Sequence, residues 1–397
     1  MNLSADWLEA ASTGKIVAAL EAARPGSARF VGGCVRNTLM GRPVDDMDIA
    51  TQLQPEETLA ALQAHEIRAI PTGIEHGTVT AIVAGEPFEI TSLRRDVETD
   101  GRRAVVAFTE DWAEDAQRRD FRMNALYAAP DGEVFDPIGG GIEDALAGRV
   151  IFIGEADARL REDYLRILRF FRFNAWYGAG IDESGLAACA RQRSGLQKIA
   201  RERIWKELKK LLAAPMPRVA VQAMAESGVL DEILPEHRGL DILHDLELTE
   251  QLTGVQPDPM LRLEALLPRS AMAVQHTQAA LRLSNDEAAR LTMWAAENLP
   301  NPVGMSAREL RATLYWHGKQ AVLDRALMAG ADIRDLLAAI RSWRRPDFPI
   351  GGDDALAIGL SGKAIGEALS RVAEAWVESD FYLERDALLK LLAADQS

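Results

Sequence analysis

Cysteine is almost absent from the 397-residue sequence, which contains only Cys34 and Cys189. Two cysteines cannot form a disulfide framework or a cysteine-rich zinc site. We therefore expect both to be small buried side chains in a protein of a reducing compartment, the cytoplasm.

Long apolar runs are also missing. No stretch of about 18 uncharged apolar residues occurs, and the first ten residues carry Asp6 and Glu9 in place of the basic and apolar regions of a secretion signal. We therefore expect neither membrane insertion nor secretion. With 48% hydrophobic and 26% charged residues, the composition is that of a globular protein, long enough for two or three domains.

A net positive charge is lacking as well. The formal net charge of −15 argues against a polyanionic partner, because nucleic-acid binding requires clustered cations. Residues 159–210, however, hold 13 Lys and Arg against 6 Asp and Glu, a local net charge of +7. Such a reversal is typical of a polyanion site, although a run of helical cations more often forms a solvated face.

The pattern of hydrophobic residues changes along the chain. Short β-type runs predict strands at residues 28–31, 47–51, 78–83, 88–93, 125–128, 133–136 and 150–153, with a helix at 56–65. After residue 155, helical periodicity replaces them. We expect an α+β head at residues 1–153, a basic helical neck at 154–215 and a helical body and tail at 216–397.

Two stretches of the neck have a predicted core face. Four apolar residues recur at helical spacing and predict a buried stripe: Ile204, Leu208, Leu211 and Leu212. Trp176 and Tyr177 follow three phenylalanines, so we expect them in the core, although an aromatic pair can also stack on a base.

A Gly-Gly turn is the strongest local signal for chemistry. Gly32 and Gly33 follow a predicted strand and precede a short expected helix, whose first amides, together with Arg36, would face an anion. Glycine also allows the backbone to approach a phosphate closely. The pattern therefore predicts a phosphate-binding turn.

Carboxylates follow this turn. Asp46 and Asp48 alternate with apolar residues, so in a strand both would lie on one face. Glu89 is a third carboxylate between apolar neighbours. Adjacent carboxylates repel each other unless a cation joins them, and Mg²⁺ typically takes one or two carboxylates together with phosphate and water.

These residues resemble the active-site signature of polymerase-beta-type nucleotidyltransferases, and in detail the bacterial class II tRNA nucleotidyltransferase (CCA-adding enzyme) and poly(A) polymerase family. Three further segments, residues 118–125, 162–169 and 202–208, are similar to the family's later motifs and occur in the same order. The resemblance covers residues 28–212, about half of the chain.

The resemblance implies a polymerase-beta-type head with a small mixed sheet, followed by an all-helical neck, body and tail. It also implies template-independent addition of CMP and AMP, from CTP and ATP, to the 3′ end of tRNA. Asp46 and Asp48 would be ligands of two Mg²⁺ ions, with Glu89 as the third catalytic carboxylate. The implied nucleotide-binding residues are Gly32, Gly33, Arg36, Arg119, Asp120, Asn124, Asp163, Arg166 and Arg169. The basic neck, body and tail would hold the acceptor stem by its phosphates.

Asp163 and Arg166 offer a way to select bases without a template. Three residues apart on a helix, the two side chains would be neighbours. Cytosine and adenine both present an amino donor beside a ring-nitrogen acceptor, which one carboxylate and one guanidinium can match. Uracil and guanine would leave both groups unpaired. The alternative interpretation is an ordinary surface ion pair.

Three residues depart from the family pattern: Asn37 replaces a frequent Asp, Arg122 a usual Thr and Tyr164 a usual Pro. Other functions also remain open. A poly(A) polymerase would typically carry a Gly-Arg-Arg-Phe-Arg-Leu type segment, whereas residues 92–96 read Ser-Leu-Arg-Arg-Asp. An enzyme that adds only CC or only the final A, or a non-catalytic RNA-binding relative, would share most of these features.

Overall fold

The computed structural model describes the chain except residues 101–102, 297, 331–332 and 395–397, and for 96–100 and 103–106 it describes the backbone alone. Two compact units are present, Met1–Pro235 and Glu236–Ser397. The predicted head and neck both lie in the first unit, and the unit boundary falls inside the predicted body and tail. Within the described ranges, all strands belong to the first unit, so the predicted fold class is confirmed.

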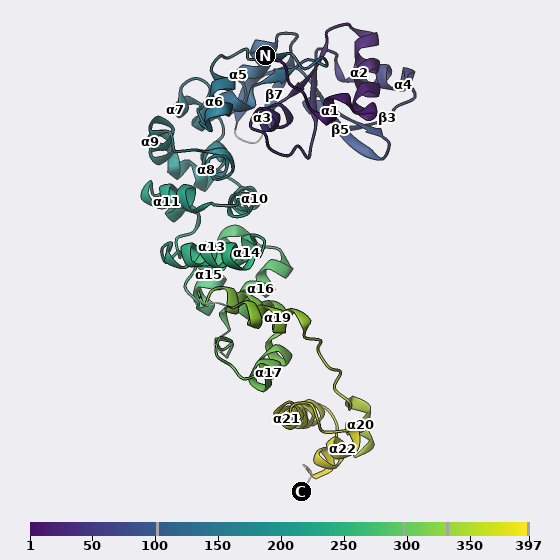
Figure 1. The fold of residues 1–397 in the computed structure, drawn as a ribbon, viewed down its shortest axis with the longest axis vertical. Coiled ribbons are helices and arrows are strands. Elements are labelled where there is room, and N and C mark those ends of the chain that lie inside the picture. Colours follow the sequence, from purple (N-terminus) through teal and green to yellow (C-terminus); the bar gives the residue numbers. More distant parts are fainter. Residues whose placement is uncertain (101–102, 297, 331–332, 395–397) are drawn as a thin grey trace. The chain divides into compact units, whose positions relative to one another are not determined.

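A mixed sheet forms the head (Figure 1). The described strands are β1 (Ala28–Val31), β2 (Asp48–Thr51), β3 (Arg68–Gly73), β4 (Thr78–Val83), β5 (Glu86–Ser92), β6 (Arg94–Asp100), β7 (Arg103–Phe108), β8 (Tyr127–Ala128) and β9 (Val134–Phe135). Seven of them make one sheet in the order β3-β4-β5-β2-β1-β8-β9, and β6 and β7 form a hairpin. β2 and β5 are parallel, and the other neighbours are antiparallel.

Helices cover the sheet and build the neck (Figure 1). In the first unit they are α1 (Asp6–Glu9), α2 (Ala11–Ala23), α3 (Gly33–Leu39), α4 (Pro55–Ala64), α5 (Trp112–Gln117), α6 (Gly141–Ala147), α7 (Ala156–Glu162), α8 (Leu165–Tyr177), α9 (Glu183–Gln192), α10 (Arg201–Leu212), α11 (Arg218–Glu226) and α12 (Val229–Ile233), with short 3-10 helices at Ile74–His76, Arg122–Asn124 and Arg193–Lys198. α2 and α4 pack together against the sheet, and α8 packs beside α10.

Aromatic packing fixes α8 against the head. The ring of Phe170 stacks on Phe152 at 5.4 Å between centroids, and Phe173 lies 5.1 Å from Phe121. Burial of these rings favours this face of α8 as the core face. The guanidiniums of Arg169 and Arg172 lie 5.4 and 4.6 Å from the centre of the Phe173 ring, so these arginines keep a fixed place relative to the sheet.

The described part of the second unit is helical. Its helices are α13 (Asp241–Thr253), α14 (Pro259–Leu266), α15 (Ala271–Leu281), α16 (Asn285–Ala295), α17 (Ala307–His317), α18 (Lys319–Leu327), α19 (Arg334–Ser342), α20 (Gly352–Ala357), α21 (Lys363–Glu378) and α22 (Arg385–Ala394). Arg262 is 1% exposed and pairs with the buried Glu250. No helix among the described residues combines the length and apolar character required to span a bilayer.

Several predictions about local structure are confirmed. The stripe on α10 is buried at all four positions, and both cysteines are buried and unbridged. Burial raises the pKa of the Cys34 thiol to about 11, so we expect this cysteine to be inert.

Other local predictions are wrong. Residues 150–153 contribute only an isolated bridge between Phe152 and Phe121. Strand β3 was not predicted, because it contains a proline, which an edge strand tolerates. The β6–β7 hairpin was missed because β6 is charged at five of its seven positions, although β7 contains the apolar run at 104–108. Tyr177 and Trp176 are half-buried and lie outside the core.

Gly141, the first residue of α6, has no room for a side chain. A Cβ atom there would lie 2.5 Å from the carbonyl oxygen of Arg122 and 3.0 Å from Cδ2 of Leu126. We expect Gly141→Ala to lower the free energy of unfolding by about 1–3 kcal/mol. Gly14 is the control, since it is exposed within α2 with no atom near its Cβ position. Gly14→Ala should raise stability by roughly 0.5–1 kcal/mol. Urea unfolding that showed the same change for both would contradict this packing.

Candidate active site

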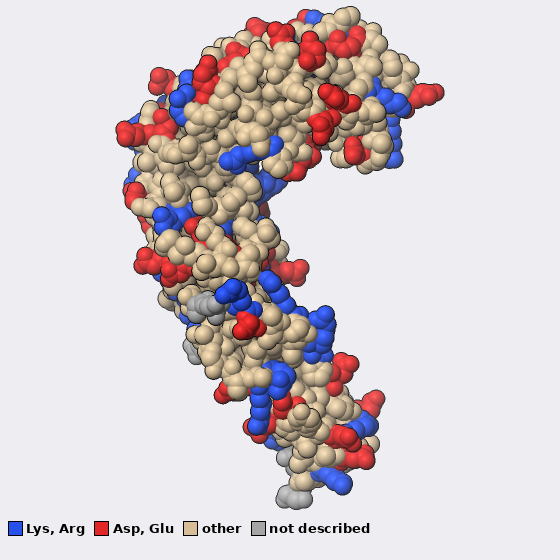
Figure 2. All heavy atoms as spheres, viewed as in Figure 1, with Lys and Arg blue, Asp and Glu red and all other residues tan. Residues whose placement is uncertain are grey.

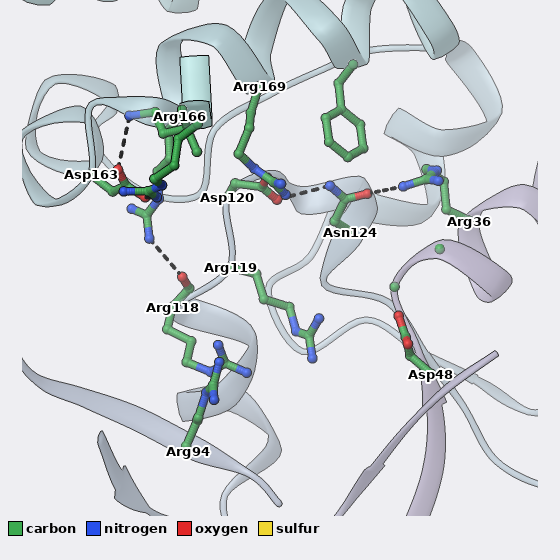
Figure 3. A pocket seen from close by; sticks show the side chains of 15 residues that line it. Arg36, Asp48, Arg94, Arg118, Arg119, Asp120, Asn124, Asp163, Arg166 and Arg169 are labelled. Atoms are coloured by element: carbon green, nitrogen blue, oxygen red, sulfur yellow. Dashed lines mark hydrogen bonds and ion pairs between the residues drawn. The ribbon is translucent and has the colours of Figure 1, made fainter. Parts of the chain in front are cut away.

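A pocket of about 560 Å³ opens in the first unit between the sheet and α8 (Figure 3). Its lining residues are Gly32, Gly33, Arg36, Asp48, Arg94, Arg118, Arg119, Asp120, Asn124, Asp163, Leu165, Arg166, Arg169, Phe173 and Arg203. All nine nucleotide-binding residues implied by the resemblance are among them. The structure therefore brings these residues together, while their individual roles remain predictions.

The Gly-Gly turn connects β1 to α3 at the edge of this pocket. Gly32 has φ of +72°, a conformation that favours glycine, and α3 begins at Gly33. Cys34 and Val35 are buried beneath the turn, so its backbone is held firmly where an anion can approach it.

Asp48 and Glu89 stand side by side on neighbouring strands. They are register partners in the parallel pair β2–β5, and both are exposed; Glu89 lies between the buried Phe88 and Ile90, and Asp48 precedes the buried Ile49. Desolvation raises the pKa of Asp48, and the charges of Glu89 and Asp46 raise it further, against the opposing effect of Arg119. The cluster therefore favours a bound cation or proton.

Asp46 does not share the strand with Asp48. β2 begins at Asp48, so Asp46 lies in the irregular segment before it and the predicted alternation does not apply. Among the residues that the structure describes, no three His, Cys, Asp or Glu side chains are close enough to hold one metal ion. Two carboxylates nevertheless fit Mg²⁺, because this ion completes its coordination with substrate phosphate and water.

A chain of hydrogen bonds crosses the pocket (Figure 3). Arg36 Nη1 donates to Asn124 Oδ1, and Asn124 Nδ2 donates to Asp120 Oδ1 at 3.0 Å. Arg169 donates to Asp120 Oδ2 from Nε at 2.7 Å and from Nη2 at 2.5 Å. Desolvation would raise the pKa of Asp120, but Arg169 and Asn124 outweigh it and lower the pKa. Asp120 thus holds two other pocket side chains in place.

The predicted contact between Asp163 and Arg166 is wrong, although both side chains line the pocket. Asp163 has extended backbone with φ of −150° and lies between α7 and α8, so helical spacing does not apply. Its Oδ1 accepts from the amide of Leu165, and its Oδ2 accepts from Arg203 Nη2, each at 3.0 Å. Arg166 pairs instead with Glu162 at 2.7 Å. The alternative of a simple Asp163–Arg166 surface ion pair is therefore wrong too.

The three departures from the family pattern each have a defined environment. Asn37 Oδ1 accepts from Arg36 at 2.8 Å. Arg122 pairs with the buried Asp144 at 2.6 Å. The ring of Tyr164 covers Gly195, where a Cβ atom would lie 2.0 Å from it. None of the three blocks the pocket.

The basic segment at residues 159–210 is largely neutralised within the fold. Its arginines pair with carboxylates in Arg159–Glu162, Arg169–Asp120, Arg172–Glu207, Arg191–Asp157 and Arg203–Asp163. Figure 2 shows acidic and basic side chains interspersed on the drawn face of this unit, and a closer grouping of Lys and Arg in the second unit. Residues 334–345 of that unit carry four Arg against one Asp, a local excess that our sequence analysis missed.

Asp115 supports the pocket from behind, and it was also missed. It is 1% exposed and pairs with Arg118 at 2.8 Å and with Arg119 at 3.0 Å. Tyr127 donates to it at 2.7 Å. The spacing of i, i+3 and i+4 on a helical segment would have indicated both ion pairs.

Two family models match the chain: the poly A polymerase head domain at residues 28–151, and the probable RNA and SrmB-binding site of polymerase A at residues 180–252. Together with a mixed-sheet head, a Gly-Gly turn and strand carboxylates beside an arginine-rich pocket, they define a nucleotidyltransferase.

Relatives with known names specify the family within this class. Mouse mitochondrial CCA tRNA nucleotidyltransferase 1 is 35% identical over 382 residues, which cover 92% of this chain and 86% of the relative. The CCA-adding enzyme of Streptococcus pyogenes is 43% identical over 206 residues, 51% of this chain and 50% of the relative. The Bacillus stearothermophilus CCA-adding enzyme solved in complex with CTP matches with a TM-score of 0.78 and 25% identity, covering 98% of both chains. The chain belongs to the family of CCA-adding tRNA nucleotidyltransferases.

The buried Asp115 predicts a specific dependence of stability on pH. Desolvation would raise its pKa, but Arg119, Arg118 and the hydrogen bond from Tyr127 outweigh this effect and lower the pKa from 3.8 to about 2. The stabilisation is therefore complete above the unfolded-state pKa and disappears as the pH falls through the lower, folded-state value.

We expect Asp115→Asn to destabilise the protein at neutral pH by on the order of 3 kcal/mol, because two arginines lose their buried counter-charge. The difference from wild type should shrink as the pH falls through the range between these two pKa values. Urea unfolding of both proteins across this range is the measurement, and a difference independent of pH would contradict the assignment.

Proposed function

We propose that this chain adds CMP and AMP, from CTP and ATP, to the 3′ end of tRNA without a nucleic-acid template, in the cytoplasm. The observation that carries the proposal is one pocket that combines the Gly-Gly turn, the β2 carboxylate and the pair Asp163 and Arg166. The family relationship over 92% of the chain favours CCA addition over poly(A) synthesis, partial addition or a non-catalytic role.

In the proposed mechanism, Asp48 and Glu89 would hold Mg²⁺, with Asp46 from the preceding segment as a further ligand and two ions as the proposed number. When bound, the metal supplies activation of the terminal ribose hydroxyl and neutralisation of charge on the triphosphate. The hydroxyl then attacks the α-phosphate in line, and pyrophosphate leaves.

The remaining pocket residues bind and orient the nucleotide. The amides at Gly32 and Gly33, together with Arg36 and Arg119, face the triphosphate. Asp120 holds Asn124 and Arg169 beside the ribose. These interactions fix the reacting phosphate before attack, which is the main contribution a protein makes to phosphoryl transfer.

Asp163 and Arg166 read the base from fixed positions. Each oxygen of Asp163 accepts one donor from the protein and retains a lone pair, so the carboxylate can also accept from the exocyclic amine of cytosine or adenine. Arg166 is held by Glu162 and by the carbonyl oxygen of Arg118 at 3.1 Å, and donates to the ring nitrogen.

In this proposal, the protein contacts the phosphate groups of the tRNA. We assign these contacts to the exposed cations of residues 159–210 and to the arginines of residues 334–345. They would hold the acceptor stem and the rest of the tRNA through its phosphate backbone. Such contacts position the 3′ end without reading its sequence.

We expect Asp48→Asn to reduce nucleotide transfer by at least roughly 100-fold, about 2.7 kcal/mol in the barrier. Stability should be unchanged or slightly higher, because the substitution relieves repulsion from Glu89. Asp45→Asn is the matched control, since Asp45 is an exposed carboxylate three residues before Asp48 to which the mechanism assigns no metal contact. Transfer assays and thermal unfolding are compared side by side. Retention of more than about a tenth of wild-type turnover by Asp48→Asn would exclude the metal-ligand role.

Asp163→Ala should narrow the preference for CTP and ATP over UTP and GTP by roughly 5- to 150-fold in kcat/KM, the cost of one discriminating buried contact. Asp157→Ala breaks an ion pair of the same kind, with Arg191, outside the pocket and should leave the ratios unchanged. The measurement is kcat/KM for all four nucleotides with a tRNA that lacks its 3′ end. Equal ratios in wild type and Asp163→Ala would show that the base is read elsewhere.

A further inference from the structure

Arg36 differs from the other pocket arginines in the chemistry of its partners. Five of those arginines contact a carboxylate: Arg118 and Arg119 contact Asp115, Arg166 contacts Glu162, Arg169 contacts Asp120, and Arg203 contacts Asp163. Within the described part of the chain, the hydrogen bonds of Arg36 go only to uncharged groups: Asn37 Oδ1, Asn124 Oδ1 and the hydroxyl of Tyr177.

Arg36 is also deeply buried, with 5% of its surface exposed. Desolvation lowers the pKa of its guanidinium. Burial of a cation is costly unless an anion compensates it. Asp120, whose charge raises the pKa of Arg36, is already paired with Arg169, and the direct contacts of Arg36 are dipoles and aromatic faces. The charge of Arg36 therefore remains available to an anionic ligand in the pocket.

Asn37 is part of this arrangement. Its side-chain oxygen accepts from Nε of Arg36 at 3.1 Å and from Nη2 at 2.8 Å. An aspartate, the residue frequent at this position in the family, would make the same contacts but would neutralise the guanidinium. The amide orients Arg36 and leaves its charge uncompensated.

Tyr177 is the partner that links Arg36 to α8, the helix that also carries Arg166. It lies at the last residue of α8, and its hydroxyl accepts from Arg36 Nη2 at 2.8 Å. The guanidinium carbon also lies 4.0 Å from the centre of the Tyr177 ring, within range of a cation–π interaction. Near the middle of α8, Arg169 connects to Arg36 through Asp120 and Asn124.

Arg36 is therefore connected to α8 twice: directly through Tyr177, and through Asn124 and Asp120 to Arg169. The two connections hold the guanidinium from two points of the helix. The bonds to Asn37, Asn124 and Tyr177 use four of the five N–H groups of Arg36 and leave one, on Nη1, for a ligand. A preorganised donor binds an anion better than a mobile one, because less conformational entropy is lost on binding.

We propose that Tyr177 is a positioning residue for triphosphate binding, and that it acts by holding the uncompensated guanidinium of Arg36 in place. The ligand class is the polyphosphate portion of a nucleoside triphosphate, whichever base it carries. This inference rests on the proposed function, since it assigns Arg36 to the triphosphate.

Tyr177→Phe removes the hydroxyl and keeps the ring. We expect KM for CTP and for ATP to rise by the same factor, about 3- to 10-fold, the equivalent of one ordinary hydrogen bond, because Tyr177 acts through Arg36 and does not contact the ligand itself. The kcat value and the preference for CTP and ATP over UTP and GTP should not change. Inorganic triphosphate, titrated by calorimetry, should bind more weakly by a similar factor, whereas inhibition by cytidine should be unaffected.

Trp176→Phe is the matched control. It removes one hydrogen bond from the neighbouring residue, to the carbonyl oxygen of Lys210, outside the pocket. This variant should leave triphosphate affinity unchanged, which separates a local effect on Arg36 from a general loosening of α8. In a double-mutant cycle, Tyr177→Phe should have little further effect once Arg36→Lys is present.

The outcomes distinguish this inference from the proposed function. Unchanged triphosphate binding in Tyr177→Phe, an altered base preference, or full additivity with Arg36→Lys would overturn the role of Tyr177 while leaving nucleotide transfer intact. A wild-type protein that transfers no nucleotide to tRNA would overturn the proposed function instead, and calorimetry with inorganic triphosphate would still decide the role of Tyr177.

Discussion

Seven arginine side chains line one pocket of about 560 Å³, and their mutual repulsion must be balanced for the first unit to fold. The balance comes from carboxylates behind the lining, Asp115 and Glu162, and from two within it, Asp120 and Asp163. Asp115, for example, is almost fully buried and holds two arginines at once. Such a layer keeps the guanidiniums in fixed positions, so an anionic substrate meets donors that are already oriented.

One of these ion pairs also connects the head to the neck. Asp120 belongs to the head, whereas its partner Arg169 lies on α8, and Phe170 of the same helix stacks on Phe152 of the head. Polar and apolar contacts therefore agree on one position for α8. Since the proposed phosphate-binding and base-reading groups come from opposite sides of this junction, their separation is fixed by the core.

The architecture and the members of the pocket could be predicted because their signals are local. The buried stripe on α10, the strand at residues 28–31 and the Gly-Gly turn each lie within a few residues of sequence, and the order of the motifs indicated which segments meet. Strand predictions failed where the pattern of apolar residues was weak, as in β3 and β6.

The contacts within the pocket could not be predicted in the same way. Asp163 bonds to Arg203 forty residues later and Arg36 bonds to Tyr177 on another helix, and nothing in the spacing of these residues indicates either pair. Helical spacing gave the wrong partner for Asp163 because extended backbone at that residue interrupts the helix. The chemistry of each side chain was predictable, but its partner depended on how distant segments pack.

The spread of the pocket along the chain has a consequence for synthesis. Its lining extends from Gly32 to Arg203, and no single segment supplies both the turn and the base-reading groups. During translation, the head can begin to fold while the later helices are still inside the ribosome. A chain whose neck is still inside the ribosome therefore lacks the groups proposed to select the base, and the pocket is complete only when residue 203 has emerged.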